Sequence, residues 1–349
     1  MAASLPSSSR NAKSAVGTVS SAVRGTAEVP PLQPGVIVNT EVADLGPVVH
    51  DHHGTCAASG QWGSVSTWFS RHSRRAVRPR LAGECRPAEG EHRADPASAQ
   101  GNSRRWIIRE VENSLRRLGT DWIDLYQIHR YDPGTDLDET LGALTDLVRA
   151  GKVRYIGHST WPVSAIVAAQ WTASDRDRER FASEQPPYSV LTRAIESDVL
   201  PTCARYGMGV IPYSPLAGGW LSGRYRTGSA AAGPTSPARQ RLANRFDLSL
   251  PENQRKLEAT EQLADLADKA GLTLIELAIA FVLWHPAVTA AIIGPRTMAH
   301  LESQLPAAEV NLPTEVLDRI DDIVPPGVTL NPADNGWVSP ALQPAARRR

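Results

Sequence analysis

The stretch WIIREVENSLRRLGTDWIDLYQIHRYDPGTDLDETLGALTDLVRAGKVRYIGHST, residues 106–160, decides the fold of this chain. Residues 106–118 and 138–150 carry apolar side chains at helical spacing with charge on the opposite face, and a glycine ends each segment. Residues 123–128 and 153–157 are short apolar runs, which are typical of buried strands. Helix, strand, helix and strand with short connections predict a parallel α/β unit.

The same alternation continues to residue 324. Further helices are predicted over residues 163–171, 194–206, 257–270, 274–283, 298–305 and 313–324, and further strands over 181–185, 210–213 and 288–293. Residues 217–243 form a long loop rich in Gly, Ser, Ala, Pro and Arg. Loops of such length inside compact domains are usually functional or mobile.

Residues 1–102 are a different kind of sequence, rich in Pro, Gly, Ser, Arg and His. Only residues 35–42 and 65–69 have the composition of strands, and we expect the rest to be irregular because it offers too little apolar surface to offset the entropy of ordering. The Ser- and Ala-rich start fits a disordered tail better than a transit peptide. We therefore divide the chain into an irregular segment 1–102, an α/β portion 103–324 and a Pro-rich tail 325–349.

Composition excludes several classes of protein. The formal net charge is +0, from 37 basic and 37 acidic residues, whereas nucleic-acid binders carry a basic excess. No stretch approaches the ~20 apolar residues of a membrane helix. The 3 cysteines show no CxxC spacing, which fits a reducing, cytoplasmic compartment. His50, His52, His53 and Cys56 lack a second cluster, so we predict no metal site.

Polar side chains stand where two of the predicted strands end. His129 follows the strand 123–128, and the pair Ser159–Thr160 follows the strand 153–157. In parallel sheets and barrels the reactive side chains lie at the carboxyl ends of strands. His129 is therefore a candidate catalytic residue, and the alternative is a structural histidine with satisfied hydrogen bonds.

Five blocks, taken in order, resemble the aldo-keto reductase family, in particular the branch of potassium-channel β-subunit-like and bacterial reductases. The blocks are SLRRLGTDWIDLYQIHR, LVRAGKVRYIGHST, EQPPYS, GVIPYSPLAGGWLSG and IIGPRT, and the similarity spans roughly residues 103–342. The resemblance implies an α/β fold of the (β/α)8 TIM-barrel type, with strands four to eight recognisable. Strands one to three belong before Ser103, where the sequence does not reveal them, so we expect an incomplete barrel.

The resemblance also implies a function. Members reduce aldehydes or ketones by hydride transfer from NADPH, so a small-molecule carbonyl substrate and NADPH/NADP are the expected partners. His129 matches the family's catalytic histidine, which orients the carbonyl. Neither a nucleic acid nor a membrane is expected as a partner, and the sequence carries no signal for oligomeric state.

The cofactor-binding residues of the family also have matches here. Ser159, Thr160 and Gln185 match the grip on the carboxamide, since hydroxyl and amide together offer a donor and an acceptor. Tyr213 matches the residue that stacks on the nicotinamide, the alternative being a core aromatic. The expected phosphate- and adenosine-binding residues are Ser214, Pro215, Leu216, Gly218, Leu221, Arg224, Gly294, Arg296 and Gln304. Arg296 is suited to the 2′-phosphate of NADP.

The family's proton donor has no match. The family uses a tyrosine tuned by a lysine and an aspartate, all encoded in the N-terminal third, but the first tyrosine here is Tyr126 and only Lys13 precedes Lys152. Two explanations are open: residues 1–102 derive from a shifted reading frame, which the abrupt change at Ser103 favours, or the protein has lost its first strands. The alternative function is accordingly a catalytically inactive nucleotide-binding remnant that acts in sensing or interaction.

Overall fold

The computed structural model describes residues 35–40, 65–68, 81–82, 101–226, 242–342 and 344–347. Its strands, in chain order, are β1 (Gly35–Thr40), β2 (Val65–Trp68), β3 (Leu81–Ala82), β4 (Ile123–Ile128), β5 (Val153–His158), β6 (Ser183–Glu184), β7 (Gly209–Val210) and β8 (Ala290–Ile293). Its α-helices are α1 (Arg104–Leu118), α2 (Leu137–Arg149), α3 (Val163–Asp175), α4 (Val199–Tyr206), α6 (Pro251–Lys269), α7 (Leu274–Trp284), α8 (Met298–Gln304), α9 (Thr314–Ile323) and α10 (Pro344–Arg347). Short 3-10 helices are η2 (Ala194–Glu196), η3 (Ala217–Ser222), η4 (Ala243–Arg245), η5 (Leu305–Glu309), η6 (Pro332–Asn335) and η7 (Pro340–Leu342).

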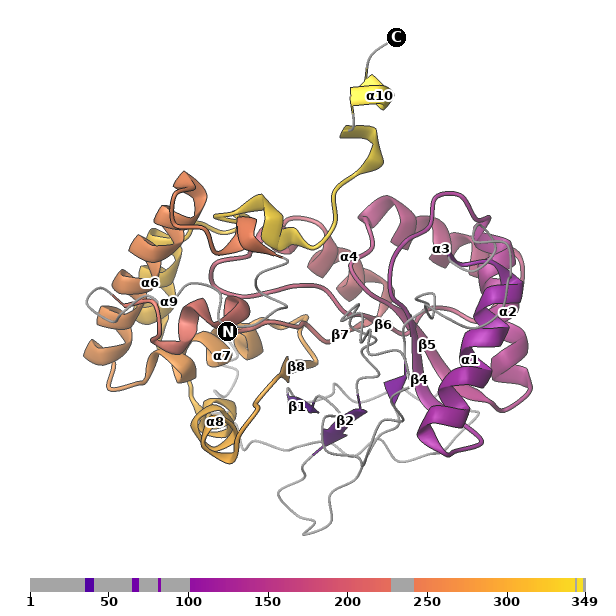
Figure 1. The fold of residues 1–349 in the computed structure, drawn as a ribbon, viewed down its shortest axis with the longest axis horizontal. Coiled ribbons are helices and arrows are strands. Elements are labelled where there is room, and N and C mark those ends of the chain that lie inside the picture. Colours follow the sequence, from indigo (N-terminus) through magenta and orange to yellow (C-terminus); the bar gives the residue numbers. More distant parts are fainter. Residues whose placement is uncertain are drawn as a thin grey trace, which may run out of the picture.

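The strands form two sheets that meet at one side. One sheet has the order β3-β4-β5-β6-β7, and all of its neighbours are parallel; the other has the order β2-β1-β8. Parallel bridges from Val210 to Val288 and from Tyr213 to Ile292 join β7 to β8. The strands lie at the centre of the molecule, with α1, α2 and α3 on one side and α6, α7, α8 and α9 on the other (Figure 1). The α/β barrel-type fold is therefore confirmed.

Three short strands, β1, β2 and β3, precede Ser103. β1 and β2 fall inside the spans 35–42 and 65–69, whereas the two-residue β3 carried no sequence signal. β1 is parallel to β8 and β3 is parallel to β4, as a barrel requires, but β2 runs antiparallel to β1. Within the described residues no ladder joins β2 to β3, so the first three strands do not form a regular parallel set.

Helix boundaries follow from capping residues. Gly119 ends α1 in the left-handed region at φ 61°, and its N–H donates to the carbonyls of α1. Asp136 accepts a hydrogen bond from the Asp138 amide at the start of α2. Thr273 and Glu276 form a reciprocal capping box at the start of α7. These local signals explain why the predicted boundaries of α1, α2 and α7 agree with the structure within two residues.

Three helices differ from the predicted ranges by more than two residues, and one of them is α3, which continues to Asp175, beyond the predicted end at residue 171. The predicted helix 194–206 is divided into η2 and α4, because Pro201 has no N–H to donate to Ser197 and so requires a new helix start. Asp198 provides that start by accepting from the Val199 amide. Helix α6 begins at Pro251, earlier than the predicted residue 257, with the proline in the first turn where its missing N–H costs nothing.

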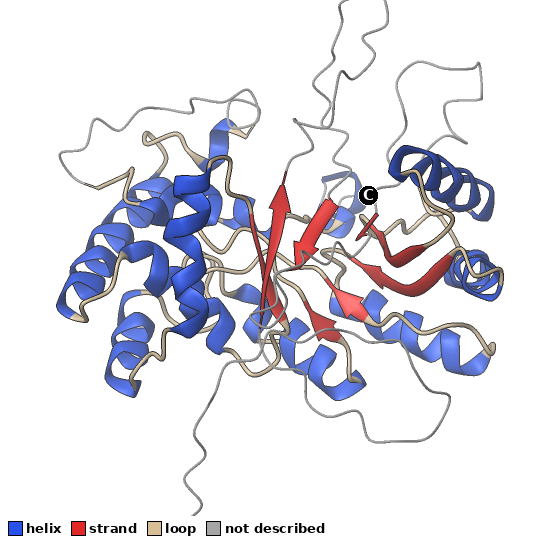
Figure 2. Ribbon diagram, turned by 90° about the horizontal axis from the view of Figure 1, so that it is seen from below, coloured by secondary structure: helices blue, strands red, loops and turns tan. Residues whose placement is uncertain are grey.

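The main core lies between the strands and the surrounding helices (Figure 2). Tyr126 and Ile128 of β4, Ile107 of α1 and Leu144 of α2 are each 0% exposed, and Ile156 of β5 is 1% exposed. Alternate residues of β4 are thus buried under α1 and α2, and the opposite residues point toward the inside of the barrel. No helix among the described residues is long and apolar enough to cross a membrane.

We predict that Leu144→Ala lowers the free energy of unfolding by about 2–5 kcal/mol, because it leaves a cavity between α2 and the sheet. Leu342→Ala is the matched control, since Leu342 is 61% exposed, and it should change stability by less than about 0.5 kcal/mol. Urea unfolding followed by circular dichroism measures both. Equal effects of the two substitutions would contradict the packing described for α2.

Candidate functional site

The candidate site is built from the ends of four neighbouring strands. His129 follows β4, Ser159 and Thr160 follow β5, Gln185 follows β6, and Tyr213 lies beyond β7. Ladder partners bring these ends together, because the last residues of β4, β5 and β6 are paired in one row and a parallel bridge joins Pro187 to Tyr213. The four strand ends therefore form one continuous edge.

Hydrogen bonds lock the first three strand ends to one another. The Ser159 amide donates to the Ile128 carbonyl (2.9 Å), and the Gln185 amide donates to the His158 carbonyl (2.9 Å). The Ser159 hydroxyl donates to the Gln185 carbonyl (2.8 Å). The Gln127 side-chain amide donates to the Gln185 side-chain carbonyl, so this bond does not use the amide hydrogens of Gln185. Ser159 and Gln185 are thus direct neighbours, and His129 lies half-buried beside them.

A buried acid–base pair supports the Ser159–Thr160 turn. Thr160 has a φ of 56°, a conformation that costs a non-glycine residue about 1–3 kcal/mol. One oxygen of Glu184 accepts from the Thr160 amide (2.7 Å), and the other contacts Nδ1 of His158. Both side chains are 0% exposed, and the His158 ring stacks on Trp161 at 4.8 Å. Glu184 therefore holds the strained turn in place.

The loop after β7 turns sharply and rests on an aromatic stack. Ser214 and Ala217 have φ values of 60° and 50°, and Gly218 has a φ of 68°. A Cβ atom on Gly218 would lie 3.1 Å from the ring of Phe246. Trp220, which is fully buried, stacks on Tyr225 at 4.3 Å. The predicted cofactor residues Pro215, Leu216 and Leu221 lie in this same loop, which is close-packed from beneath.

The remaining predicted residues lie further along the same edge. Gly294 follows β8 with open space at its Cα, and Arg296 is exposed just before α8. Gln304 is buried at the end of α8, and Arg224 is exposed beyond η3. Among the described residues no hydrogen bond joins Arg296 or Gln304 to the ends of β4, β5 and β6. The structure thus brings Ser159, Thr160 and Gln185, the residues predicted to bind the carboxamide, into direct contact. The residues predicted to bind the phosphates are connected to them through the parallel bridges between the β7 and β8 regions.

The C-terminal strap, residues 328–336, crosses the site. The Arg193 amide donates to the Val328 carbonyl (3.0 Å), and the Leu330 amide donates to the Leu191 carbonyl (3.2 Å). Gly336, at φ 74°, ends the strap where a Cβ atom would meet Tyr213 Oη at 2.7 Å and the Thr160 methyl at 3.3 Å. Only glycine allows this approach, so the strap covers the two residues that flank the ends of β5 and β7.

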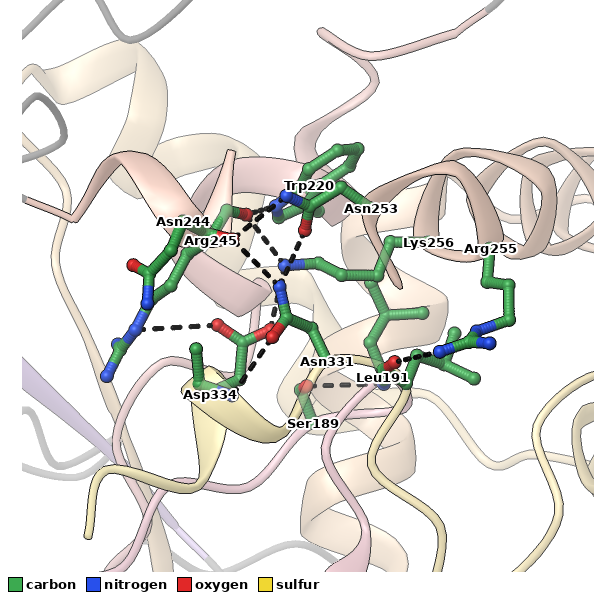
Figure 3. Close-up of polar contacts among 12 residues, drawn as sticks. Ser189, Leu191, Trp220, Asn244, Arg245, Asn253, Arg255, Lys256, Asn331 and Asp334 are labelled. Carbon is green, nitrogen blue, oxygen red and sulfur yellow. Dashed lines mark hydrogen bonds and ion pairs between the residues drawn. The ribbon is translucent and has the colours of Figure 1, made fainter. Parts of the chain in front are cut away.

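A buried lysine anchors the strap (Figure 3). Lys256 of α6 is 0% exposed, and its ammonium donates to Asp334 Oδ2 (2.7 Å) and to the Arg245 carbonyl (3.0 Å). The same ammonium lies 4.6 Å from the centre of the Trp220 ring. Burial lowers the pKa of Lys256, while the Asp334 carboxylate opposes that shift. Lys256 therefore ties the strap, η4 and the loop after β7 to one point on α6.

A pair of buried amides completes this anchor one turn away on α6. The Asn331 side chain donates to the Asn253 side-chain carbonyl (2.8 Å) and to the Asn244 carbonyl (3.0 Å). The Asn253 side chain donates in turn to the carbonyls of Asn244 (3.0 Å) and Asp247 (2.8 Å). Figure 3 shows the contacts among Asn331, Asn253 and Asn244 beside those of Lys256. The side-chain amides of Asn253 and Asn331 thus both donate and accept hydrogen bonds, as their burial requires.

Sequence reasoning missed Glu184, His158, Lys256 and Asp334. The first two occupy paired strand positions that the apolar pattern does not distinguish from core residues. Lys256 lies in a helix with many charges, where a lysine usually faces solvent. Its partner is 78 positions away in sequence, so no local spacing could reveal the pair. The histidine run 50–53 and Cys56 lie outside the described residues.

A loop after β4 holds the backbone next to His129. The Asn102 side chain donates to the Arg130 carbonyl (3.0 Å), and the Asn102 amide donates to Asp132 (3.0 Å). Asp132 also accepts from the Gly134 amide (2.9 Å) and the Thr135 hydroxyl (2.6 Å). Burial raises the pKa of Asp132, but these three hydrogen bonds outweigh it and hold the pKa below the usual value.

Comparison with known proteins identifies relatives of the whole site region. The model of the aldo/keto reductase family matches residues 85–325. An uncharacterized oxidoreductase, YrpG of Bacillus subtilis (strain 168), is 37% identical over 261 residues, which cover 75% of this chain and 76% of the relative. A putative voltage-gated potassium channel subunit beta of Schizosaccharomyces pombe is 34% identical over 227 residues, covering 64% and 65%. Protein tas of Escherichia coli (strain K12) is 31% identical over 280 residues, covering 74% and 78%.

We predict that Asp334→Asn destabilises the protein by about 3 kcal/mol, because it leaves the Lys256 ammonium buried without a counter-charge. The double variant Lys256→Met with Asp334→Leu should recover most of that loss. Asp322→Asn is the control, since its ion pair with Arg319 is exposed and should be worth less than about 1 kcal/mol. Urea unfolding measures all three. A double variant as unstable as Asp334→Asn would argue against an electrostatic origin.

We predict a pH dependence from Asp132. Its pKa in the folded state lies below the unfolded value near 3.8, so the folded state binds the proton less readily. The resulting stabilisation is present above that value and is lost as the pH falls through the folded pKa. The difference in unfolding free energy between wild type and Asp132→Asn should thus be constant at neutral pH and shrink in acid. The exposed Asp121→Asn exchange serves as control and should have little effect at any pH.

Proposed function

Because this chain belongs to the aldo/keto reductase family, we propose that it is an NADPH-dependent oxidoreductase that reduces aldehydes or ketones. The observation that carries the proposal is the convergence of His129, Ser159, Gln185 and Tyr213 on adjacent strand ends. Two of its relatives are named as an uncharacterized oxidoreductase and a putative aryl-alcohol dehydrogenase. Membership of the family makes this chain an oxidoreductase by resemblance. Its cofactor and its substrate are what we propose here.

The donor set fits the nicotinamide half of the cofactor. A carboxamide needs both an acceptor and a donor, and the Ser159 hydroxyl with the amide hydrogens of Gln185, which no described residue accepts, supplies them within one hydrogen-bonded unit. Tyr213, which lies beyond β7, is the residue we propose to stack on the nicotinamide, and Thr160 adjoins Ser159. The cofactor supplies the hydride. The residues of this chain bind and orient it, and the strap over Tyr213 excludes water from that end.

The substrate carbonyl belongs beside His129. This side chain lies half-buried at the end of β4, next to the Ser159–Gln185 unit. An imidazole there can donate a hydrogen bond to the carbonyl oxygen and fix its orientation toward the nicotinamide. We assign His129 this orienting role in the proposed reaction.

The phosphates of the cofactor would lie along the β7–β8 side. Ser214, Pro215, Leu216, Gly218 and Leu221 form the loop proposed to wrap the pyrophosphate, with Arg224 at its end. Gly294 and Arg296 precede α8 with open surroundings, which suits a phosphate. Arg296 is the residue we propose for the 2′-phosphate, which favours NADP over NAD. His300 and Gln304 are proposed as further contacts of the adenosine.

A second function is favoured by the residues that are missing. The family's tyrosine and lysine have no match, since Tyr126 is the first tyrosine and only Lys13 precedes Lys152. Without a proton donor the chain would bind the nucleotide without turnover, as a sensing or interaction subunit. One relative has a name that includes a potassium channel subunit beta. We propose the cytoplasm as the compartment for either function.

We predict that NADPH quenches the tryptophan fluorescence of the purified chain and that Arg296→Ala weakens NADPH binding about tenfold or more, by loss of a charge-assisted contact to the phosphate. Binding of NADH should not change, and Arg149→Ala, at the exposed end of α2, should affect neither. Turnover of a generic aldehyde such as 4-nitrobenzaldehyde decides between the two functions. Absence of NADPH binding would rule out both.

A further inference from the structure

Arg130 follows His129 directly and folds over the ends of β4 and β5. Its Nη1 donates to the His129 carbonyl (2.8 Å) and, more weakly, to the Ser159 hydroxyl (3.4 Å). Its own carbonyl is held by the Asn102 side chain (3.0 Å), which fixes the backbone from which the side chain departs. The guanidinium is therefore placed between the proposed carbonyl-orienting histidine and the proposed carboxamide-binding serine.

No acidic side chain within the described part of the chain forms an ion pair with Arg130. The nearest carboxylate in sequence, Asp132, is occupied by Asn102, Gly134 and Thr135. Other half-buried or buried arginines do have acidic partners: Arg178 pairs with Asp138, Arg193 with Glu196 and Asp321, and Arg245 with Asp334. Arg130 differs from them because its hydrogen bonds to described residues go to two neutral acceptors, the His129 carbonyl and the Ser159 hydroxyl.

This arrangement leaves binding capacity for an anion. A guanidinium has five N–H donors in a planar fork, and the two hydrogen bonds that Arg130 makes to described residues both use Nη1. The remaining donors on Nη2 and Nε form the edge that takes a carboxylate with two parallel hydrogen bonds. Partial burial strengthens such a contact, since Arg130 is half-buried and its charge is incompletely solvated.

We propose that Arg130 binds a carboxylate carried by the substrate, so that the site selects carbonyl compounds that are also carboxylic acids. One guanidinium balances one negative charge, which fits a carboxylate better than a phosphate monoester with its ~1.5–2 charges. The phosphates of the cofactor belong to the β7–β8 side and do not compete for this residue. The inference rests on the proposed function, because it takes the substrate carbonyl to lie beside His129.

The test compares acids with their methyl esters on the NADPH-loaded chain. Calorimetric titrations use pyruvate against methyl pyruvate and 4-oxopentanoate against its methyl ester, two pairs that differ in the distance from carbonyl to carboxylate. Wild type should bind at least one acid about tenfold or more tightly than its ester, the typical worth of a charge-assisted pair. Arg130→Met should abolish the ratio, and Arg130→Lys should retain part of it because charge persists without the fork.

The matched control is Arg149→Met, the same exchange at an exposed position on α2, which should leave the acid-to-ester ratio unchanged. The ratio is the decisive readout because a general loss of folding or of NADPH affinity lowers acid and ester binding alike. Equal binding of acid and ester by wild type, or an unchanged ratio in Arg130→Met, overturns this inference and leaves the proposed function intact. A chain that binds no NADPH overturns both.

Discussion

The hydrogen bond from the Thr160 amide to the buried carboxylate of Glu184 is the constraint on which the rest of the site depends. It joins the end of β5 to the end of β6 at the one residue of that turn with a left-handed backbone. Burying a carboxylate is costly unless its oxygens are satisfied, and here His158 and Thr160 satisfy both. The ordering of this pair places the Ser159 hydroxyl on the Gln185 carbonyl and so creates the unit proposed to grip the nicotinamide.

A second set of buried polar contacts acts at long range. Lys256 and Asn253 lie one turn apart on α6 and hold the strap, η4 and the loop after β7 together. If one member of such a network is removed, its partners are left buried without hydrogen bonds, which is costly. The network therefore favours one arrangement of the strap, η4 and the loop after β7. The strap is fixed to α6 at one end and lies against Tyr213 and Thr160 at the other. The position of α6 therefore helps to fix the strap over the edge where the strand ends meet.

The charge at Arg130 gives this edge a chemical preference. The ends of β4 and β5 carry an imidazole, hydroxyls and amides, none of which selects strongly for charge. A guanidinium beside them, which among the described residues contacts a carbonyl and a hydroxyl, makes the edge complementary to an anion. The strand ends of the barrel therefore hold the residues proposed to orient the cofactor and the carbonyl. Arg130, in the loop after β4, sets the proposed class of substrate.

The sequence by itself determined the elements whose signals are local: the ranges of α1, β4, α2, β5 and α7 follow from periodicity and capping residues within a few positions of each end. It also pointed to His129, Ser159, Gln185 and Tyr213, because strand ends and family blocks are readable along the chain. The tertiary structure alone decided the antiparallel course of β2 and the pairing of Lys256 with Asp334. Those features depend on contacts between residues far apart in sequence, and the free energy of a buried charge is set by partners that no local pattern contains.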